Sequence, residues 1–138
     1  MTQEEDDGEV TYETYMPDSY RGISRRTLEK YGVIFQKYNN KEQVVYQYPH
    51  ATKYRTLPKD IVCKGNLDSF YGQEDYNSGG RAITITEGEE DRLSVIEMMG
   101  DWPCVSVPNA TPSKAFWANA REYLANFEKI YLSLDNDK

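Results

Sequence analysis

The sequence predicts an α/β protein with two parts: an α+β amino-terminal subdomain, followed by a parallel sheet in β-α-β-α-β order. From residue 80 onward, short β-branched runs alternate with segments of helical periodicity, and the connections between them are short. Before residue 80, β-branched and aromatic runs flank turn residues, as they do in an antiparallel hairpin. A length of 138 residues accommodates one domain or two very small ones.

Charge is distributed unevenly and divides the chain into segments. Residues 1–20 contain seven acidic residues and no Lys or Arg, whereas residues 21–64 contain ten basic residues and three acidic ones. The remainder contains six basic and thirteen acidic residues. The basic block is either the footprint of a polyanion site or a solvated face with a charge bias. We expect an acidic disordered tail over 1–19, a basic subdomain over 20–79 and the parallel-sheet domain over 80–138.

Several classes of protein are disfavoured by the composition. No apolar run approaches the ~18–20 residues that cross a bilayer, and no basic start followed by an apolar stretch marks a secretory signal. Cys63, Cys104 and His50 fall short of a four-ligand zinc site. Two cysteines are also too few for a disulfide scaffold. We therefore expect a cytoplasmic protein with no membrane partner.

The basic subdomain is expected to contain one short helix and a hairpin. Ser24 is a suitable N-cap for a helix over 24–31, and Gly32 ends it. VIFQKY (33–38) and QVVYQY (43–48) are strand-like runs on either side of a turn. The stretch 49–80 is expected to be irregular because Pro and Gly recur in it. Its aromatic residues could stack nucleobases or, more commonly in so small a domain, form core.

The parallel-sheet domain is read from five consecutive segments. Strands are expected over 81–86, 104–107 and 129–135. The segment 87–100 opens on a tight turn and becomes a helix, with Leu93, Ile96 and Met99 at helical spacing. A second helix is expected over 113–127, following a loop in which Pro112 suits a first helical position.

Two acidic clusters follow strands of this sheet, at the carboxyl ends where ligands usually bind. Glu87-Gly88-Glu89-Glu90-Asp91 follows the first strand, and Asp135-Asn136-Asp137 follows the third. Convergent carboxylates suit Mg²⁺ or Mn²⁺, especially beside phosphate oxygens. Acids in the first turn of a helix can also be simple dipole partners, and Asp135 and Asp137 could belong to a solvated loop. The two clusters together on neighbouring strands favour a metal site.

These residues resemble a known family. Glu87-Gly88-x-x-Asp91 after a strand, with a later strand ending in Asp135-x-Asp137, is similar to the Toprim signature. Arg21-Gly22-Ile23-Ser24, Lys64-Gly65 and Phe70-Tyr71-Gly72 resemble the region upstream of Toprim in the primase half of phage-type primase-helicases. Bacterial DnaG-type primases and Twinkle helicases are similar too. The resemblance covers about residues 20–138. It implies a Toprim domain truncated at its carboxyl end, in an amino-terminal fragment without a zinc module or helicase domain.

The resemblance implies a reaction and a set of residues. The reaction is metal-dependent synthesis of short RNA primers from ribonucleoside triphosphates on a single-stranded DNA template, in a phage-infected bacterial cell. A carboxyl-terminal helicase domain would be the partner in the full-length protein. By this resemblance Glu87, Asp91 and Lys64 are catalytic, and Glu87, Asp135 and Asp137 hold Mg²⁺ or Mn²⁺. Arg21, Lys53, Arg55 and Lys64 would bind nucleotide or DNA.

One departure from the family pattern keeps other readings open. Phage primases carry a basic residue directly after the aromatic-Gly pair, whereas this chain has Gln73 there. This departure favours a catalytically silent Toprim module that binds single-stranded DNA and supports a helicase. A Toprim nuclease is a third reading, because it shares the acidic motifs.

Overall fold

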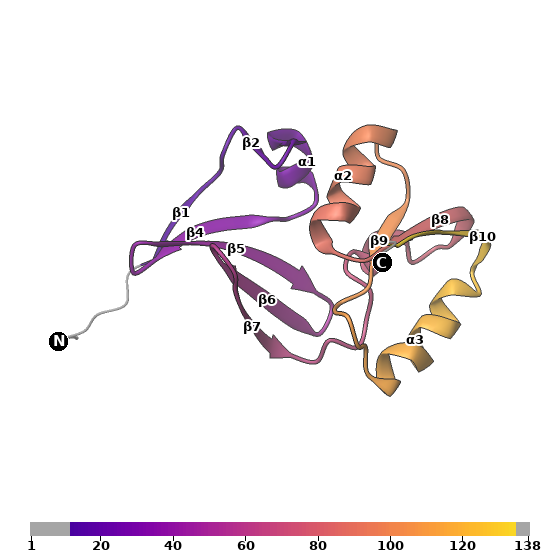
Figure 1. Ribbon diagram of the computed structural model, residues 1–138. Helices are drawn as coiled ribbons and strands as arrows, with labels where there is room; N and C mark the ends of the chain where they lie inside the picture. Colours follow the sequence, from indigo (N-terminus) through magenta and orange to yellow (C-terminus); the bar gives the residue numbers. More distant parts are fainter. Residues whose placement is uncertain (1–11, 135–138) are drawn as a thin grey trace.

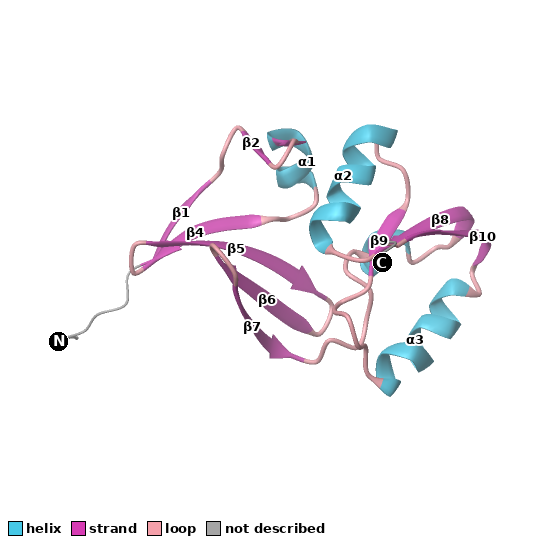
Figure 2. Ribbon diagram, in the orientation of Figure 1, coloured by secondary structure: helices cyan, strands magenta, loops and turns pink. Residues whose placement is uncertain are grey.

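The computed structural model describes residues 12–134 and contains two principal sheets (Figures 1 and 2). A five-stranded antiparallel sheet has the order β1-β4-β5-β6-β7, and a three-stranded sheet has the order β10-β8-β9. A small β2-β3 pair precedes the first helix. The strands are β1 (Tyr12–Tyr15), β2 (Ser19–Tyr20), β3 (Ile23–Ser24), β4 (Ile34–Tyr38), β5 (Lys41–Tyr48), β6 (Ala51–Thr56), β7 (Asp60–Gly65), β8 (Gly80–Thr86), β9 (Cys104–Ser106) and β10 (Phe127–Ser133). The helices are α1 (Arg25–Lys30), the 3-10 turn η1 (Gln73–Tyr76), α2 (Glu89–Met99) and α3 (Lys114–Leu124).

The predicted helix and hairpin of the amino-terminal half are confirmed. The Ser24 side chain accepts a hydrogen bond from the Thr27 backbone N–H, so Ser24 caps α1 as expected. The hairpin turn is tighter than the predicted four residues, since Tyr38 pairs with Lys41. Asn39 and Asn40 have φ values of 50° and 65°. Positive φ at both central residues is the requirement of a type I′ turn, which asparagine tolerates well.

The expectation of an irregular stretch over 49–80 was wrong, because β6 and β7 lie within it and extend the antiparallel sheet. The strand signal was missed for a physical reason. The inward positions of β6 are Lys53 and Arg55, so the alternation of apolar and polar residues that marks a half-buried strand is absent. These cations face carboxylates of α2 and not an apolar core.

The predicted tail over 1–19 also needs correction where the structure describes it. Tyr12–Tyr15 forms β1 and pairs with β4. Tyr12 packs on Tyr38 with ring centroids 5.2 Å apart, and Tyr15 packs on Phe35 at 6.0 Å. Such cross-strand aromatic pairs stabilise a sheet edge. Residues 1–11, where the rest of the predicted tail falls, lie outside the described residues.

The α/β fold class and its parallel β-α-β-α-β unit are confirmed. β8 pairs in parallel with both β10 and β9. The chain moves outward from β8 to β9 and then crosses back over β8 to β10, so right-handed crossovers put α2 and α3 on opposite faces. Figure 1 shows the two helices on opposite sides of this sheet. Phe116, Ala120 and Tyr123 of α3 form one core with Ile83, Ile85 and Val105 of the sheet.

The antiparallel sheet has a second core, which α2 joins. This core contains Ile23, Leu28, Phe35, Tyr46, Tyr48 and Leu93 among its buried residues. Arg92 of α2 is 1% exposed, and its guanidinium carbon lies 5.0, 4.9 and 5.9 Å from the ring centroids of Tyr31, Tyr71 and Tyr76. Its Nε donates to the Cys104 carbonyl at 2.6 Å. Helix α2 therefore packs against both halves of the molecule, and its position relative to each is fixed.

Candidate active site

The turn between β8 and α2 carries the first acidic motif. The buried Thr86 hydroxyl donates to the Gly88 carbonyl at 3.1 Å. Gly88 is extended (φ −137°, ψ 164°), a conformation open to any residue, so the turn does not need glycine for its backbone angles. The Asp91 carboxylate folds back toward this turn, because a Cβ added at Gly88 would lie 3.5 Å from Asp91 Oδ2. Glu87 and Asp91 are both exposed.

The sheet register aligns the ends of β8 and β10. Ser133 of β10 pairs with Thr86 of β8, so the chain leaves both strands at the same level. Asp135 and Asp137 lie outside the described residues. Within residues 12–134 no cluster of three or more His, Cys, Asp or Glu side chains is arranged to hold a metal ion. The described oxygen donors at this edge are the two exposed carboxylates of Glu87 and Asp91.

Glu89, the next acid, faces the antiparallel sheet. Lys53 Nζ lies 2.5 Å from Glu89 Oε2, and the Tyr48 hydroxyl donates to the same carboxylate oxygen. Lys53 Nζ also donates to the Pro108 carbonyl at 2.5 Å and is 8% exposed. Burial beside Glu89 raises the pKa of the Tyr48 hydroxyl. Tyr48 therefore stays protonated and donates its hydrogen bond to Glu89 throughout the physiological pH range.

Glu90 is the centre of a larger cluster. Arg55 and Arg21 form ion pairs with its two carboxylate oxygens, the latter at 3.1 Å. The hydroxyls of Tyr46 and Tyr20 donate to Oε2 at 2.9 and 3.1 Å. Burial disfavours the charged form, but the hydrogen bonds from Arg55 and Tyr46 outweigh it and lower the pKa of Glu90. Glu90 is thus an ionised anchor between the two halves of the molecule.

The carboxyl end of α2 is anchored as well. Glu97 Oε1 accepts hydrogen bonds from the Thr27 hydroxyl at 2.6 Å and from the Ser24 backbone N–H at 3.1 Å, which lower its pKa. Asp101 pairs with Arg26 at 2.8 Å and with Lys30 at 3.1 Å, and these contacts lower its pKa too. The acids of α2 and of its carboxyl end thus meet the cations and the helix start of the amino-terminal half.

The predicted nucleotide- or DNA-binding cations divide into two groups. Arg21, Lys53 and Arg55 converge on the start of α2, where Glu89 and Glu90 neutralise them. Lys64 is not brought to them. It pairs in register with Thr52, so it lies on the opposite face of the antiparallel sheet from Lys53 and Arg55. Its Nζ sits 5.4 Å from the centroid of the Tyr54 ring.

Sequence reasoning missed the tyrosine hydroxyls of this site. Tyr20, Tyr46 and Tyr48 all donate to Glu89 or Glu90. The signal lay in QVVYQY, where the tyrosines occupy alternate positions of a predicted strand and so share one face. A tyrosine that packs in a core brings a hydroxyl that needs a partner, and the acidic cluster at 87–91 offered several carboxylates as partners.

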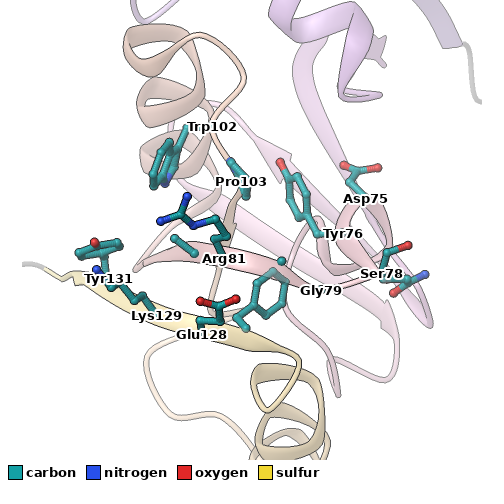
Figure 3. Close-up of a pocket in the computed structure, with 14 residues that line it drawn as sticks. Asp75, Tyr76, Ser78, Gly79, Arg81, Trp102, Pro103, Glu128, Lys129 and Tyr131 are labelled. Carbon is teal, nitrogen blue, oxygen red and sulfur yellow. The ribbon is translucent and has the colours of Figure 1, made fainter.

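A cavity of about 560 Å³ lies at the other end of the parallel sheet (Figure 3). It is lined by the amino-terminal parts of β8 and β10, with Trp102, Tyr131, Arg81 and Lys129 around it. Trp102 is held there by a hydrogen bond of 2.8 Å from its indole nitrogen to Thr84 Oγ1. Because Glu87 follows the carboxyl end of β8, this cavity is separate from the candidate active site. Gln73 also does not reach that site: its side-chain oxygen accepts from the Phe70 backbone N–H at 3.1 Å.

Comparisons with known proteins were made by sequence and by structure. No family model matches the chain. Among curated proteins, the DNA helicase/primase of Enterobacteria phage T3 is 33% identical over 127 residues, and a primase homolog protein of Arabidopsis thaliana is 30% identical over 139 residues. Each match covers 85% of this chain. The chain spans 22% and 40% of the length of these two relatives.

Two solved structures resemble the chain closely. The primase fragment of the bacteriophage T7 primase-helicase protein matches with a TM-score of 0.76 and 33% identity, covering 86% of this chain and 53% of that one. The second is a complex of T7 lagging-strand DNA polymerase with primase domains of two gp4 subunits bound to an RNA/DNA hybrid and dTTP. It matches with a TM-score of 0.79 and 30% identity, covering 92% of this chain and 69% of that one.

Proposed function

This chain belongs to the Toprim primase family of phage-type primase-helicases, and we propose that it synthesises short RNA primers on single-stranded DNA during DNA replication. The observation that carries the proposal is the register of the parallel sheet. Thr86 and Ser133 pair at the ends of β8 and β10. In the sequence the first acidic motif follows Thr86 and the second begins two residues after Ser133, and the proposal needs both motifs to meet at this edge. The basic residues Lys53 and Arg55 reach the same edge from the antiparallel sheet.

We assign the metal to Glu87, Asp135 and Asp137, with Asp91 in a supporting role. The described part of this set fits Mg²⁺ or Mn²⁺, because Glu87 and Asp91 are exposed carboxylates at a strand end and carboxylate oxygens are the ligands that these ions prefer. A bound divalent cation would neutralise triphosphate charge and lower the barrier to attack by a 3′-hydroxyl. The chain's own contribution is to hold Glu87 at the fixed end of β8, with Asp91 folded toward the same turn.

The remaining proposed partners follow from the family. They are a single-stranded DNA template, ribonucleoside triphosphates and a helicase domain on the carboxyl side of the primase region, acting in the cytoplasm of an infected bacterium. Among residues 12–134 no helix is long and apolar enough to cross a membrane. Of the three proposed cations beside α2, Arg21 has the best access to these partners, since half of its side chain is exposed beside Glu90.

One observation favours a second function, a catalytically silent module that supports a helicase. Lys53 and Arg55 are both paired with glutamates, and the side chain of Gln73 is occupied by the Phe70 backbone. In such a module the cations would stabilise the docking of α2 and would not bind phosphate. The two functions differ in ribonucleotide binding, which the silent module does not need.

The test is a titration of Mg²⁺ or Mn²⁺ followed by NMR, with the Asp135→Ala/Asp137→Ala variant as the control. Primase function predicts saturable, coupled responses at Glu87, Asp91 and the residues after Ser133, which the variant loses. A subsequent titration with a ribonucleoside triphosphate should then give a second saturable response. A metal response without ribonucleotide binding would select the silent module, and the absence of any saturable metal response would contradict the proposed active site.

A further inference from the structure

The outer face of the antiparallel sheet, which faces away from α2, carries a groove of about 200 Å³. We call it the tyrosine groove, and its lining residues are Tyr12, Tyr38, Gln43, Tyr54, Val62 and Lys64. We propose that the tyrosine groove binds single-stranded nucleic acid by stacking bases on its rings, at a site separate from the candidate active site. The proposal does not depend on primer synthesis, because binding here requires neither the carboxylates nor a metal.

The register of five strands brings these residues to one face. Tyr12 of β1 pairs with Tyr38 of β4, and Tyr54 of β6 pairs with Val62 of β7. Lys64 follows Val62 by two positions and therefore points to the same side. Lys53 and Arg55, which alternate with Tyr54, point to the opposite side and contact Glu89 and Glu90 there. The same sheet thus presents neutralised cations on its inner face and aromatic rings on its outer face.

The Tyr12 ring is exposed, and the Tyr38 and Tyr54 rings are half-buried in the same face of the sheet. Tyr12 is 62% exposed and lies beside Tyr38 with the ring planes tilted by 37°. Val62, opposite Tyr54, is 53% exposed. Beneath them Gln43 is fixed by hydrogen bonds, accepting from Gln36 Nε2 at 2.7 Å and donating to Thr56 Oγ1 at 3.0 Å. Tyr12 and Val62 together leave apolar area in water on one face of the sheet, and a contiguous apolar patch of this kind favours a binding surface.

The charge of the groove matches a polyanion. Lys64 Nζ lies 5.4 Å from the centroid of the Tyr54 ring, so a base stacked on that ring would bring its phosphate near the ammonium group. No carboxylate among residues 12–134 forms an ion pair with Lys64, and none of the six described lining residues is acidic. A cation beside stacked rings is the combination that binds single strands with little sequence preference. Bases in a duplex are already stacked and would not enter the groove.

The test measures binding of a fluorescently labelled single-stranded oligothymidylate, without divalent metal, over a range of salt concentrations. Tyr54→Leu keeps apolar packing but removes the ring, and Lys64→Gln removes one charge from an exposed position. Tyr131→Leu and Lys129→Gln are matched controls, since both lie exposed on the other sheet. We expect Tyr54→Leu to weaken binding at least about fivefold. Lys64→Gln should lower the slope of log affinity against log salt by about 0.7.

Two further measurements distinguish a loss of oligonucleotide binding from a loss of folding. Thermal unfolding compares each variant with the parent chain, and NMR follows the ring protons of Tyr12, Tyr38 and Tyr54 in the unaltered chain as the oligonucleotide is added. Upfield shifts of these protons are expected when bases stack on the rings. Equal affinities for the Tyr54→Leu and Lys64→Gln variants and their controls, or unmoved ring protons, would overturn the proposal. If the groove binds a protein partner and not nucleic acid, the ring protons will not shift when the oligonucleotide is added.

Discussion

Four acidic residues lie within five positions at the start of α2, and they form two pairs with different surroundings. Glu89 and Glu90 are largely buried against Lys53, Arg55 and tyrosine hydroxyls of the antiparallel sheet. Glu87 and Asp91 are exposed at the end of β8. The inward pair joins the two halves of the molecule, and this leaves the outward pair on a turn whose position is fixed. Acidic residues close together in the sequence therefore divide between an interface inside the fold and the exposed turn at which we propose the metal site.

The substitution Glu90→Ala is the strongest test of the difference between the two pairs of acids. It removes the shared partner of Arg55, Arg21, Tyr46 and Tyr20 and leaves the Arg55 charge unpaired. Removing one partner of a buried pair is costly, so we expect a loss of about 2–4 kcal/mol in the free energy of unfolding, measured with urea. Glu87→Ala should cost less than about 1 kcal/mol because that side chain is exposed. Equal losses would show that the two pairs do not differ.

Lys53→Met tests the inward pair from the opposite strand. The substitution keeps the apolar stem but removes the ammonium group that contacts Glu89 and the Pro108 carbonyl. We expect a loss of about 2 kcal/mol, since Glu89 would remain with only the Tyr48 hydroxyl. Combining Lys53→Met with Glu89→Gln should restore part of this stability. Strict additivity in this double-mutant cycle would contradict a direct ion pair.

Tyr46→Phe isolates a single hydrogen bond to Glu90. The ring and its packing on Tyr71 are kept, and only the hydroxyl that donates at 2.9 Å is lost. A hydrogen bond to a charged group suggests a loss of about 1.5 kcal/mol. Urea unfolding measures it, and Tyr131→Phe is the matched control on an exposed ring. If the Tyr46→Phe variant is as stable as that control, the Tyr46 hydroxyl does not stabilise the fold through Glu90.

Acidic pH should weaken the same contacts of α2. We expect it to lower the free energy of unfolding by less than Glu90→Ala does. Hydrogen bonds and ion pairs lower the pKa values of Glu90, Glu97 and Asp101 in the folded chain. Their contribution to stability is therefore complete above the unfolded-state pKa of about 4 and is lost as the pH falls below it. Urea unfolding from pH 7 to pH 3 should show a plateau down to about pH 5 and then a decline. In Glu90→Ala the decline should be shallower.

The smallest effect is expected at the far end of α2. Arg26 pairs with Asp101, but its side chain is 65% exposed. Exposed pairs commonly contribute nothing measurable, so Arg26→Gln should leave the unfolding midpoint unchanged. A clear loss would mean that both ends of α2 are anchored with similar strength, which the difference in burial argues against.

Periodicity was sufficient for the parallel-sheet domain but not for the antiparallel sheet. Leu93 and Ile96 marked α2, although the charged Arg92 is buried beside them, and Phe116 and Ala120 marked the apolar buried face of α3. In β6 the inward residues are Lys53 and Arg55, whose partners belong to a helix some 35 residues away in sequence. A local sequence pattern does not show that an inward-facing cation has a carboxylate partner that is distant in the sequence. Charge distribution alone left the basic block open between a polyanion site and a solvated face, whereas part of it is paired within the chain.

For the site, the sequence identified residue types and strand ends but not which acids face inward. Glu87 and Asp91 were singled out through a resemblance, and the placement of Glu89 and Glu90 required the tertiary structure. The roles of Asp135 and Asp137 remain predictions, since these residues lie outside the described part of the chain. Lys64 was grouped with Lys53 through the resemblance, but strand alternation separates the two onto opposite faces.

The strand order of the parallel sheet has a consequence for local opening. β8, which leads to Glu87, is bonded on both sides, whereas β10 pairs only with β8 among the described strands. Amide hydrogens near Thr84 and Ile85 should therefore exchange with solvent more slowly than those near Tyr131 and Leu132. A cation bound by carboxylates at the ends of both strands would stabilise β10, which is the less protected strand. Hydrogen exchange with and without Mg²⁺ should show the slowing concentrated in β10.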